Sequence, residues 1–348
     1  MAQRELGDIQ GQPLPSIAVL EMFQGMWLAR SIYVATKLGI PDLLRDGPRS
    51  TVDLATVTKT HEPSLYRLLR GLASVGIFSE VEQRQFAQTP FSHVLCPNAP
   101  DSIHHWILAL GDTWQWEPWV NLEHSIQTGE TAFSRHHGVS IWGYFNKHPE
   151  AEKNFGLGMT DFSQIVNEPV TLAYDFSAYS TLVDIGGGHG SFLTGILKQY
   201  PEMKGILFER PAVIEEAKKH IGEDLKERCT LIGGDFFEEV PEGIDVYIIK
   251  QCLHNWGDEH GIKLLRACRK AMRPDSKILI VDRVLVSDRE HDPFNTLNKY
   301  WDIIMLAIAG GKERTRDEFA RIYEASGIKL TRIIPTHTPL SIVEGIPG

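Results

Sequence analysis

The sequence predicts an α/β protein in which a mainly helical N-terminal part precedes a mainly parallel, seven-stranded sheet with helices on both faces. Up to about residue 160, apolar residues recur at helical spacing. From residue 179 onward, short apolar segments alternate with amphipathic helical ones, as in parallel sheets with crossover helices. The first of these segments, 183–190 (VDIGGGHG), breaks into a glycine turn that leads into a helix. Ligand sites of such folds begin at a turn of this kind.

Length and composition exclude several classes of protein. The chain has 348 residues, which fits two domains, and its 42% hydrophobic and 23% charged residues are typical of globular proteins. We find no apolar run of about 20 residues that would cross a bilayer, and no export signal. The four cysteines form no C-x-x-C pair, so we expect a reducing, cytoplasmic location. A net charge of −10 argues against a nucleic-acid surface.

The N-terminal part is expected to hold helices followed by a small hairpin. Residues 1–15 are polar with two prolines and predict a flexible arm. In the next domain, 16–160, leucines at helical spacing end near Gly76, and two short strands follow at 77–81 and 85–87. Helices followed by a hairpin make a winged-helix-like unit, which binds DNA in some proteins and a second subunit in others.

Tryptophan is concentrated between residues 103 and 159, which hold five of the eight in the chain. One interpretation is helix packing and a dimer interface. The other is that some of these rings line an aromatic substrate pocket, because such walls are common in small-ligand sites. The five residues are Trp106, Trp114, Trp116, Trp119 and Trp142.

The third predicted domain, 161–348, carries the alternating strands and helices. Parallel sheets bind ligands at the carboxyl ends of their strands. Strands are expected at 181–185, 205–208, 230–232, 245–249, 277–281, 328–334 and 341–344. Helices are expected at 191–200, 212–220, 259–272 and 317–325, the last with a capping box from Thr315 to Glu318.

The glycine turn favours a ligand without a pyrophosphate. A dinucleotide fingerprint needs G-x-G-x-x-G. Here Gly186 and Gly188 are followed by Ser191 at the third position, and Gly190 falls one residue early. A tight turn without any ligand is the alternative.

Residues at the ends of later strands extend this site. Glu209 is placed to accept both hydroxyls of a ribose, unless it is a solvated strand end. Asp235 is placed to accept from an adenine amino group while Phe236 packs on the ring; the alternative for Asp235 is an Asx turn. Lys250 is placed to reach a carboxylate of the ligand, or else is a surface charge.

A candidate general base follows the same strand as Lys250. His254 is this candidate, because a histidine side chain ordinarily has a pKa of about 6.5 and can take a proton at neutral pH. One of its ring nitrogens must be held in a fixed tautomer, and Asp282 or Glu313 are the candidate carboxylates. Read alone, His254 is equally a structural histidine, and the two acids are loop carboxylates.

These segments, taken in order, resemble the motifs of S-adenosylmethionine-dependent O-methyltransferases of the caffeic acid, isoflavone and hydroxyindole type. The similarity covers nearly the whole chain, and the matching segments are 183–190, 233–237, 250–260, 280–285 and 310–315. The resemblance implies a Rossmann-like class I methyltransferase domain behind a winged-helix-like domain that forms a homodimer. It implies transfer of a methyl group from S-adenosylmethionine, without a metal, to a hydroxyl of a small phenolic metabolite of secondary metabolism.

The resemblance also assigns roles to residues. It implies that His254 is the catalytic base, supported by Asp282 and Glu313. Cofactor binding is expected from Asp184, Gly186, Gly188, Glu209, Asp235, Phe236, Lys250 and Trp256. Substrate contacts are expected from Trp116, Phe155, Met159 and Met305, which otherwise belong to the core.

Two departures from the family and two rival functions remain. Glu209 stands where many plant members have aspartate, and the segment 305–311 is one residue shorter than in plant relatives. One rival is a methyltransferase fold repurposed as a cyclase, decarboxylase or hydroxylase. The other is a winged-helix regulator, which the acidic hairpin, with Arg84 against Glu80 and Glu82, disfavours.

Overall fold

The computed structural model describes residues 14–287 and 290–348. The predicted arm, 1–15, lies outside the described residues except for its last two, and Pro15 already begins a helix. The chain divides into two compact units, an N-terminal unit that ends at Gly111 and a C-terminal unit from Asp112 to Gly348. The boundary expected at residue 160 instead falls inside a long helix, Pro149–Leu172, whose buried Val166 and Val170 belong to the core of the sheet.

The N-terminal unit is helical with a small antiparallel sheet. Its sheet has the order β1-β3-β2, so the predicted hairpin is confirmed and gains a two-residue strand. Leu65, Leu69 and Leu72 lie on one face of a helix and pack with Phe78 and Phe86 of the hairpin. The elements are α1 (Pro15–Phe23), α2 (Gly25–Lys37), α3 (Ile40–Leu43), β1 (Arg49–Ser50), α4 (Thr51–Thr58), α5 (Glu62–Ala73), β2 (Phe78–Glu82), β3 (Gln85–Gln88), α6 (Pro90–His93) and α7 (His104–Gly111).

The C-terminal unit contains the predicted seven-stranded sheet, with the order β11-β12-β8-β7-β4-β5-β6. Every predicted strand is present, and only β12 runs antiparallel to its neighbours. The chain order reverses between β4 and β7, which is where open α/β sheets bind ligands. The strands are β4 (Thr181–Ile185), β5 (Lys204–Glu209), β6 (Cys229–Gly233), β7 (Val246–Lys250), β8 (Lys277–Asp282), β11 (Ile328–Pro335) and β12 (Ser341–Pro347).

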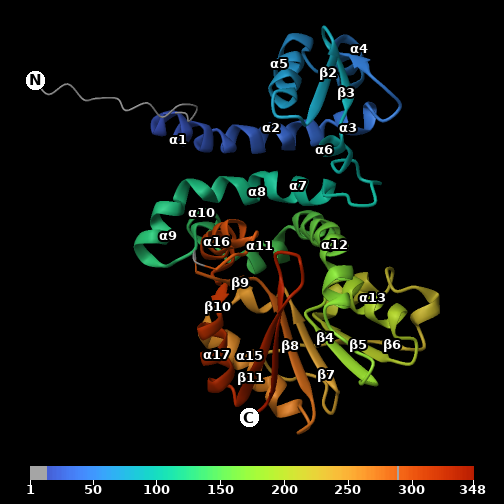
Figure 1. Cartoon of the computed structure of the whole chain (residues 1–348), viewed down its shortest axis with the longest axis vertical. Coiled ribbons are helices and arrows are strands. Elements are labelled where there is room, and N and C mark those ends of the chain that lie inside the picture. The colour runs from blue at the N-terminus through green and yellow to red at the C-terminus, as the bar shows by residue number, and fades with distance from the viewer. Residues whose placement is uncertain (1–13, 288–289) are drawn as a thin grey trace, which may run out of the picture. The chain divides into compact units, whose positions relative to one another are not determined.

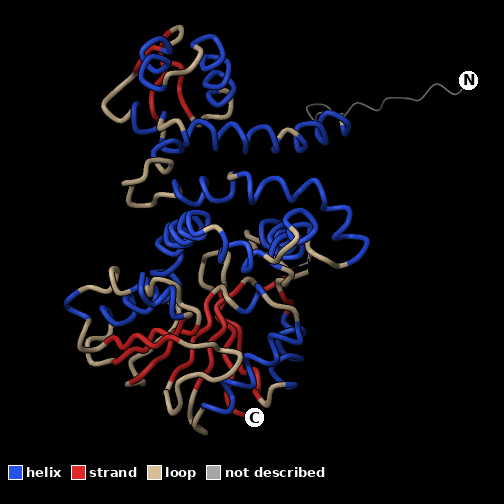
Figure 2. The backbone as a smooth tube through the Cα atoms, turned by 180° about the vertical axis from the view of Figure 1, so that it is seen from behind, coloured by secondary structure: helices blue, strands red, loops and turns tan. Residues whose placement is uncertain are grey.

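Helices cover both faces of this sheet, as predicted. Leu182 faces a core that includes α13 (Ser191–Gln199), and the next residue, Val183, faces a core that includes α15 (Asp258–Ala271) and α17 (Arg316–Ala325). Figure 1 shows α13 on one side of the strands and α15 and α17 on the other. Figure 2 shows the strands as one layer between helices. Thr315 and Glu318 form the predicted capping box of α17.

Further helices of this unit pack around buried aromatic rings. Trp114 is 5% exposed and contacts Phe133 and Phe145, so helix packing is confirmed for this tryptophan. The remaining elements are α8 (Thr113–Trp116), η1 (Glu117–Asn121), α9 (Leu122–Thr128), α10 (Ala132–His137), α11 (Ile141–Lys147), α12 (Pro149–Leu172), α14 (Pro211–Ala217), η2 (Glu223–Leu225), η3 (Leu253–Asn255), β9 (Val284–Leu285), α16 (Asn295–Ile304), the π-helical turn η4 (Met305–Ala309) and β10 (Arg314–Thr315).

Candidate active site

The glycine turn after β4 has the backbone that the sequence predicts. Gly186 and Gly188 have φ angles of 70° and 57°, which favour glycine. A Cβ on Gly186 would lie 2.8 Å from the Cys252 sulfur, whereas a Cβ on Gly188 would meet nothing within 4 Å. Gly190 precedes α13 and offers no side-chain acceptor to the amides of its first turn.

Two carboxylates lie beside this turn. Glu209 accepts hydrogen bonds from the amides of Gly188, at 3.3 Å, and Arg210, at 2.7 Å. Its side chain is only 12% exposed, so it is not a solvated strand end. Asp184 is fully buried, and burial raises its pKa to about 7 despite the nearby Lys250 and the Leu193 amide of α13.

Aromatic rings form a wall next to the glycine turn. Phe236 lies 3.7 Å from a Cβ placed on Gly186. Trp256 packs edge-on against Phe236, with ring centroids 6.4 Å apart, and stacks with Trp142 at 6.0 Å. Asp235 accepts the Phe237 amide at 2.8 Å, so the Asx turn is present and the adenine contact stays a prediction.

Lys250 is not a surface charge. Its ammonium donates to the Ser163 hydroxyl of α12 at 3.1 Å. Burial lowers the pKa of Lys250 to about 8, and the charges of Asp184 and Asp282 oppose that change. The position suits a contact with an anionic group at the end of β7.

His254 lies in η3, directly after β7, and is 5% exposed. Its Nδ1 is 2.8 Å from Oε1 of Glu313, which is 1% exposed. A carboxylate only accepts, so Nδ1 carries the hydrogen and Nε2 has a lone pair for a proton. Burial lowers the pKa of His254, but the negative charges of Glu313 and Asp282 outweigh it and raise the pKa above its usual value.

The backbone fixes Glu313 against His254. The Lys312 amide donates to the His254 carbonyl at 2.9 Å, and the Glu313 amide donates to Asp302 at 2.8 Å. Gly311 permits this approach, since a Cβ there would lie 1.9 Å from the His254 oxygen. The parallel pairing of β9 with β10 then holds the segment beside the end of β8.

Asp282 behaves differently from Glu313. It is 1% exposed, and neither oxygen has a hydrogen-bond partner among the described residues. Burial raises its pKa, while the charge of His254 lowers it. The structure therefore brings both predicted acids to His254, but only Glu313 hydrogen-bonds to the ring.

Two buried arginines were not anticipated from the sequence. Arg283 has its Nη1 3.6 Å from Oε1 of Glu313. Arg314 donates to the Trp256 carbonyl at 2.9 Å and to Asp258 at 2.9 Å, which fixes the loop that follows His254. Both are 1% exposed. For Arg283 the available signal was an arginine directly after a mainly apolar strand, whereas Arg314 lies in a polar segment that gives no such signal.

The predicted substrate residues lie on the helices of this unit. Phe155 packs against Phe145, with ring centroids 5.2 Å apart, as a core residue would. Met159 follows one turn later on α12 and is partly buried, and Met305 opens η4 and is 7% exposed. Trp116 ends α8 and is also partly buried. A substrate role for the four stays a prediction.

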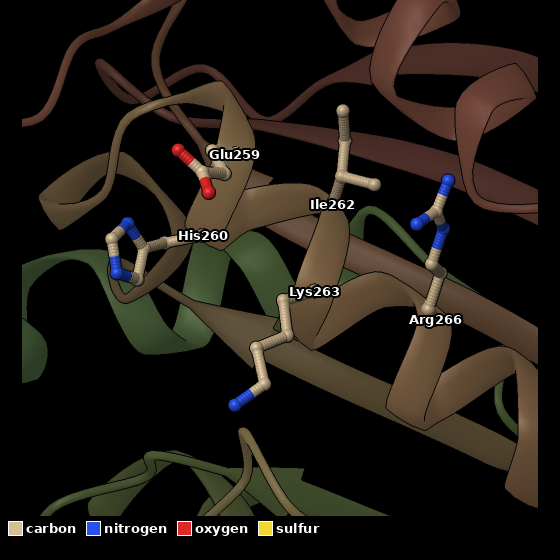
Figure 3. A pocket seen from close by; sticks show the side chains of 5 residues that line it. All are labelled: Glu259, His260, Ile262, Lys263 and Arg266. Carbon is tan, nitrogen blue, oxygen red and sulfur yellow. The ribbon is translucent and has the colours of Figure 1, made fainter.

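A separate hollow of about 450 Å³ lies on the outer surface of α15. Its five lining side chains all come from this helix and spread away from one another (Figure 3). They are Glu259, His260, Ile262, Lys263 and Arg266, and none was predicted as a site residue.

Residues 14–287 and 290–348 hold neither a metal-binding cluster nor a membrane-spanning helix. No three His, Cys, Asp or Glu side chains in these ranges are grouped to hold a metal ion. None of the helices in the same ranges combines the length and apolarity of a membrane span.

Comparison with known proteins identifies relatives along the whole chain. Residues 119–329 match the model of an O-methyltransferase domain, and residues 20–98 match an O-methyltransferase dimerisation domain. The phenazine O-methyltransferase PhzM of Lysobacter antibioticus is 44% identical over 336 residues, which are 96% of this chain and 97% of that protein.

Solved structures agree with this match. The crystal structure of LaPhzM is 43% identical and covers 97% of this chain and 100% of its own, with a TM-score of 0.90. The S-adenosylhomocysteine-bound form of CalO1, a methyltransferase in calicheamicin biosynthesis, is 32% identical with a TM-score of 0.84, over 96% of this chain and 98% of its own.

Proposed function

This chain belongs to the S-adenosylmethionine-dependent O-methyltransferase family, and we propose that it methylates a hydroxyl of a small phenolic molecule with His254 as general base. The contact that carries the proposal is the one between His254 and Glu313, 2.8 Å apart and both buried. Because Nδ1 is bound to Glu313, Nε2 is the nitrogen that can accept a proton. His254 lies at the carboxyl edge of the sheet, as the glycine turn does.

The residues around the glycine turn fit the cofactor. The open space over Gly188 admits a ligand against the backbone. We propose that Gly186 and Gly188 receive its methionine end, with Lys250 at the carboxylate and Asp184 nearby. Glu209 would hold the ribose, and the adenine would lie at Asp235, Phe236 and Trp256.

The protein must align the phenol with the methyl donor and remove the proton of the phenol. S-adenosylmethionine supplies a methyl group that its sulfonium makes electrophilic. A phenol has a pKa near ~10 and is a weak nucleophile at neutral pH, so removal of its proton by His254 is worth about 10²–10⁴-fold. Glu313 keeps the ring in the accepting tautomer and stabilises the imidazolium that forms. Asp282 adds negative charge without a hydrogen bond.

An aromatic acceptor is supported by the rings and thioethers on the nearby helices. Phe155, Met159, Met305 and Trp116 are the residues we propose as its contacts, since apolar walls suit flat molecules. A relative named for methylation of phenazine, which is 44% identical, is consistent with this class.

A homodimer through the N-terminal domain is the proposed assembly. α1 has no buried residue although it is almost entirely apolar. Its exposed side chains include Leu20, Met22 and Phe23, and Trp27 of α2 is 60% exposed. Contiguous apolar surface of this kind marks a contact with another protein chain. A cytoplasmic location stays a prediction.

The test is methyl transfer to a library of phenols by the wild-type protein and by His254→Gln. We expect a methylated product with release of S-adenosylhomocysteine, and a His254→Gln rate lower by about 10²–10⁴-fold. Affinity for S-adenosylhomocysteine should be unchanged, and His93→Gln, which changes an exposed histidine of the N-terminal unit, should keep the wild-type rate. A full rate in His254→Gln would contradict the proposal.

A further inference from the structure

Arg283 is a buried cation at the wall of the proposed site. It follows β8 and is 1% exposed. Its guanidinium lies 4.2 Å from the ring centre of Trp301 on α16 and 5.5 Å from that of Phe162 on α12. A buried charge is costly unless it is paired. Within the described part of the chain, the Arg283 guanidinium has only two aromatic faces and one carboxylate, 3.6 Å away, as partners. Its burial therefore costs free energy, which suggests a functional role for the charge.

The carboxylate near Arg283 is Glu313, which also binds the ring of His254. Arg283 Nη1 is 3.6 Å from Glu313 Oε1, and the same oxygen is 2.8 Å from His254 Nδ1. Nε and Nη1 of Arg283 have no hydrogen-bond partner among the described residues, so the interaction is one of charge. Asp282 is the second buried carboxylate beside this group.

The other charged groups around these side chains have partners of their own. Lys250, at the end of β7, donates to Ser163. Arg314 of β10 is bound to Asp258. Asp302 of α16 accepts a hydrogen bond from the amide of Glu313. Arg283 is thus the cation in direct contact with the carboxylate that binds His254.

We propose that Arg283 is a positioning residue that shares the charge of Glu313 and Asp282 and so limits how strongly His254 holds a proton, which keeps Nε2 available as an acceptor. Without this cation the two carboxylates would hold a proton on the imidazole more strongly, and a larger share of the rings would be unable to act as a base. The inference rests on the proposed function for its catalytic meaning. Consistent with it, both carboxylates raise the pKa of His254, whereas Arg283 lowers it.

The experiment measures the titration of His254 directly. Full-length protein with ¹³C-labelled histidine is titrated by NMR, and His254→Gln identifies the signal. In Arg283→Met we expect the midpoint of His254 to rise by about one pH unit or more, because a unit charge within about 6 Å has an effect of that size. Arg283→Lys keeps the charge and should return the midpoint toward the wild-type value. Arg266→Met, an exposed arginine, is the matched control.

The activity profile gives a second readout. The acidic limb of kcat/KM should move to higher pH in Arg283→Met, with a loss of about tenfold at a pH one unit below the wild-type midpoint and recovery at high pH. A midpoint that is unchanged or lower would overturn the inference, as would a loss of equal size at every pH. Should Arg283→Met not fold, Arg283→Gln takes its place, with the same rise expected.

The two readouts separate this inference from the proposed function. The NMR midpoint needs no acceptor, so it tests Arg283 even if no phenol is methylated. Methylation with an unshifted midpoint would leave the proposed function standing and remove the role of Arg283.

Discussion

Replacing Glu313 by glutamine tests the electrostatic part of the proposed mechanism. The substitution keeps the shape of the side chain and an oxygen that can accept the Nδ1 hydrogen of His254, 2.8 Å away. It removes the negative charge that stabilises the imidazolium. Because Glu313 is 1% exposed, solvent does little to screen that charge.

The size of the effect follows from the distance. Unit charges about 4 Å apart at an effective dielectric of about 20 interact by about 4 kcal/mol. Asp282 remains as a second negative charge, so we expect a loss of about 2–4 kcal/mol, or about 30- to 1000-fold in kcat. Glu313 raises the pKa of His254, so its loss should also lower that pKa and move the acidic limb of the profile to lower pH.

The assay is the initial rate of S-adenosylhomocysteine release between pH 5.5 and 9.5 at saturating cofactor. The exposed Glu324→Gln serves as the control with an unchanged profile. A Glu313→Gln rate within about threefold of the wild type, or an acidic limb that moves to higher pH, would refute the electrostatic role.

Three further predictions concern the framework of the site. Gly311→Ala should lower kcat at least as much as Glu313→Gln and lower Tm, because its Cβ would lie 1.9 Å from the His254 carbonyl, whereas Gly195→Ala, with nothing within 4 Å, should fold normally. Arg314→Met should lower the free energy of unfolding by about 1–3 kcal/mol, since the buried Leu253 carbonyl and the partly buried Trp256 carbonyl lose their donor; an unchanged urea midpoint would count against this. Asp184 has a folded pKa of about 7, above its unfolded value near ~3.9, so the folded state binds the extra proton. The stability that this proton provides is present at low pH and lost as pH rises toward 7, and Asp184→Asn should flatten the fall of Tm between pH 5 and 7.

Sequence periodicity located the main elements of the fold because burial on both faces gives an unmistakable pattern. The segment 181–185 is apolar apart from Thr181 and Asp184, and it forms β4, an inner strand of the sheet. Two-residue strands have no periodic signal, so the pairing of β9 with β10 was not predictable. The helical pattern continues from the N-terminal unit through α12 (Pro149–Leu172), so periodicity does not mark the division after Gly111.

Site residues that directly follow strand ends could be predicted from the sequence. Site residues whose positions depend on long-range packing could not. Lys250, His254 and Asp282 lie close to the carboxyl ends of β7 and β8, so topology brings them together. Arg283 and Arg314 are buried against the usual preference of arginine for the surface. The contacts that their guanidinium groups make depend on long-range packing, which no local pattern encodes.

The most direct test of the central claim is a crystal structure of the protein with S-adenosylhomocysteine and a phenol that it methylates. We expect the acceptor oxygen within about 2.6–3.2 Å of Nε2 of His254, with Nδ1 still on Glu313. An acceptor oxygen out of reach of Nε2, or a protein group that fills this position, would contradict the account.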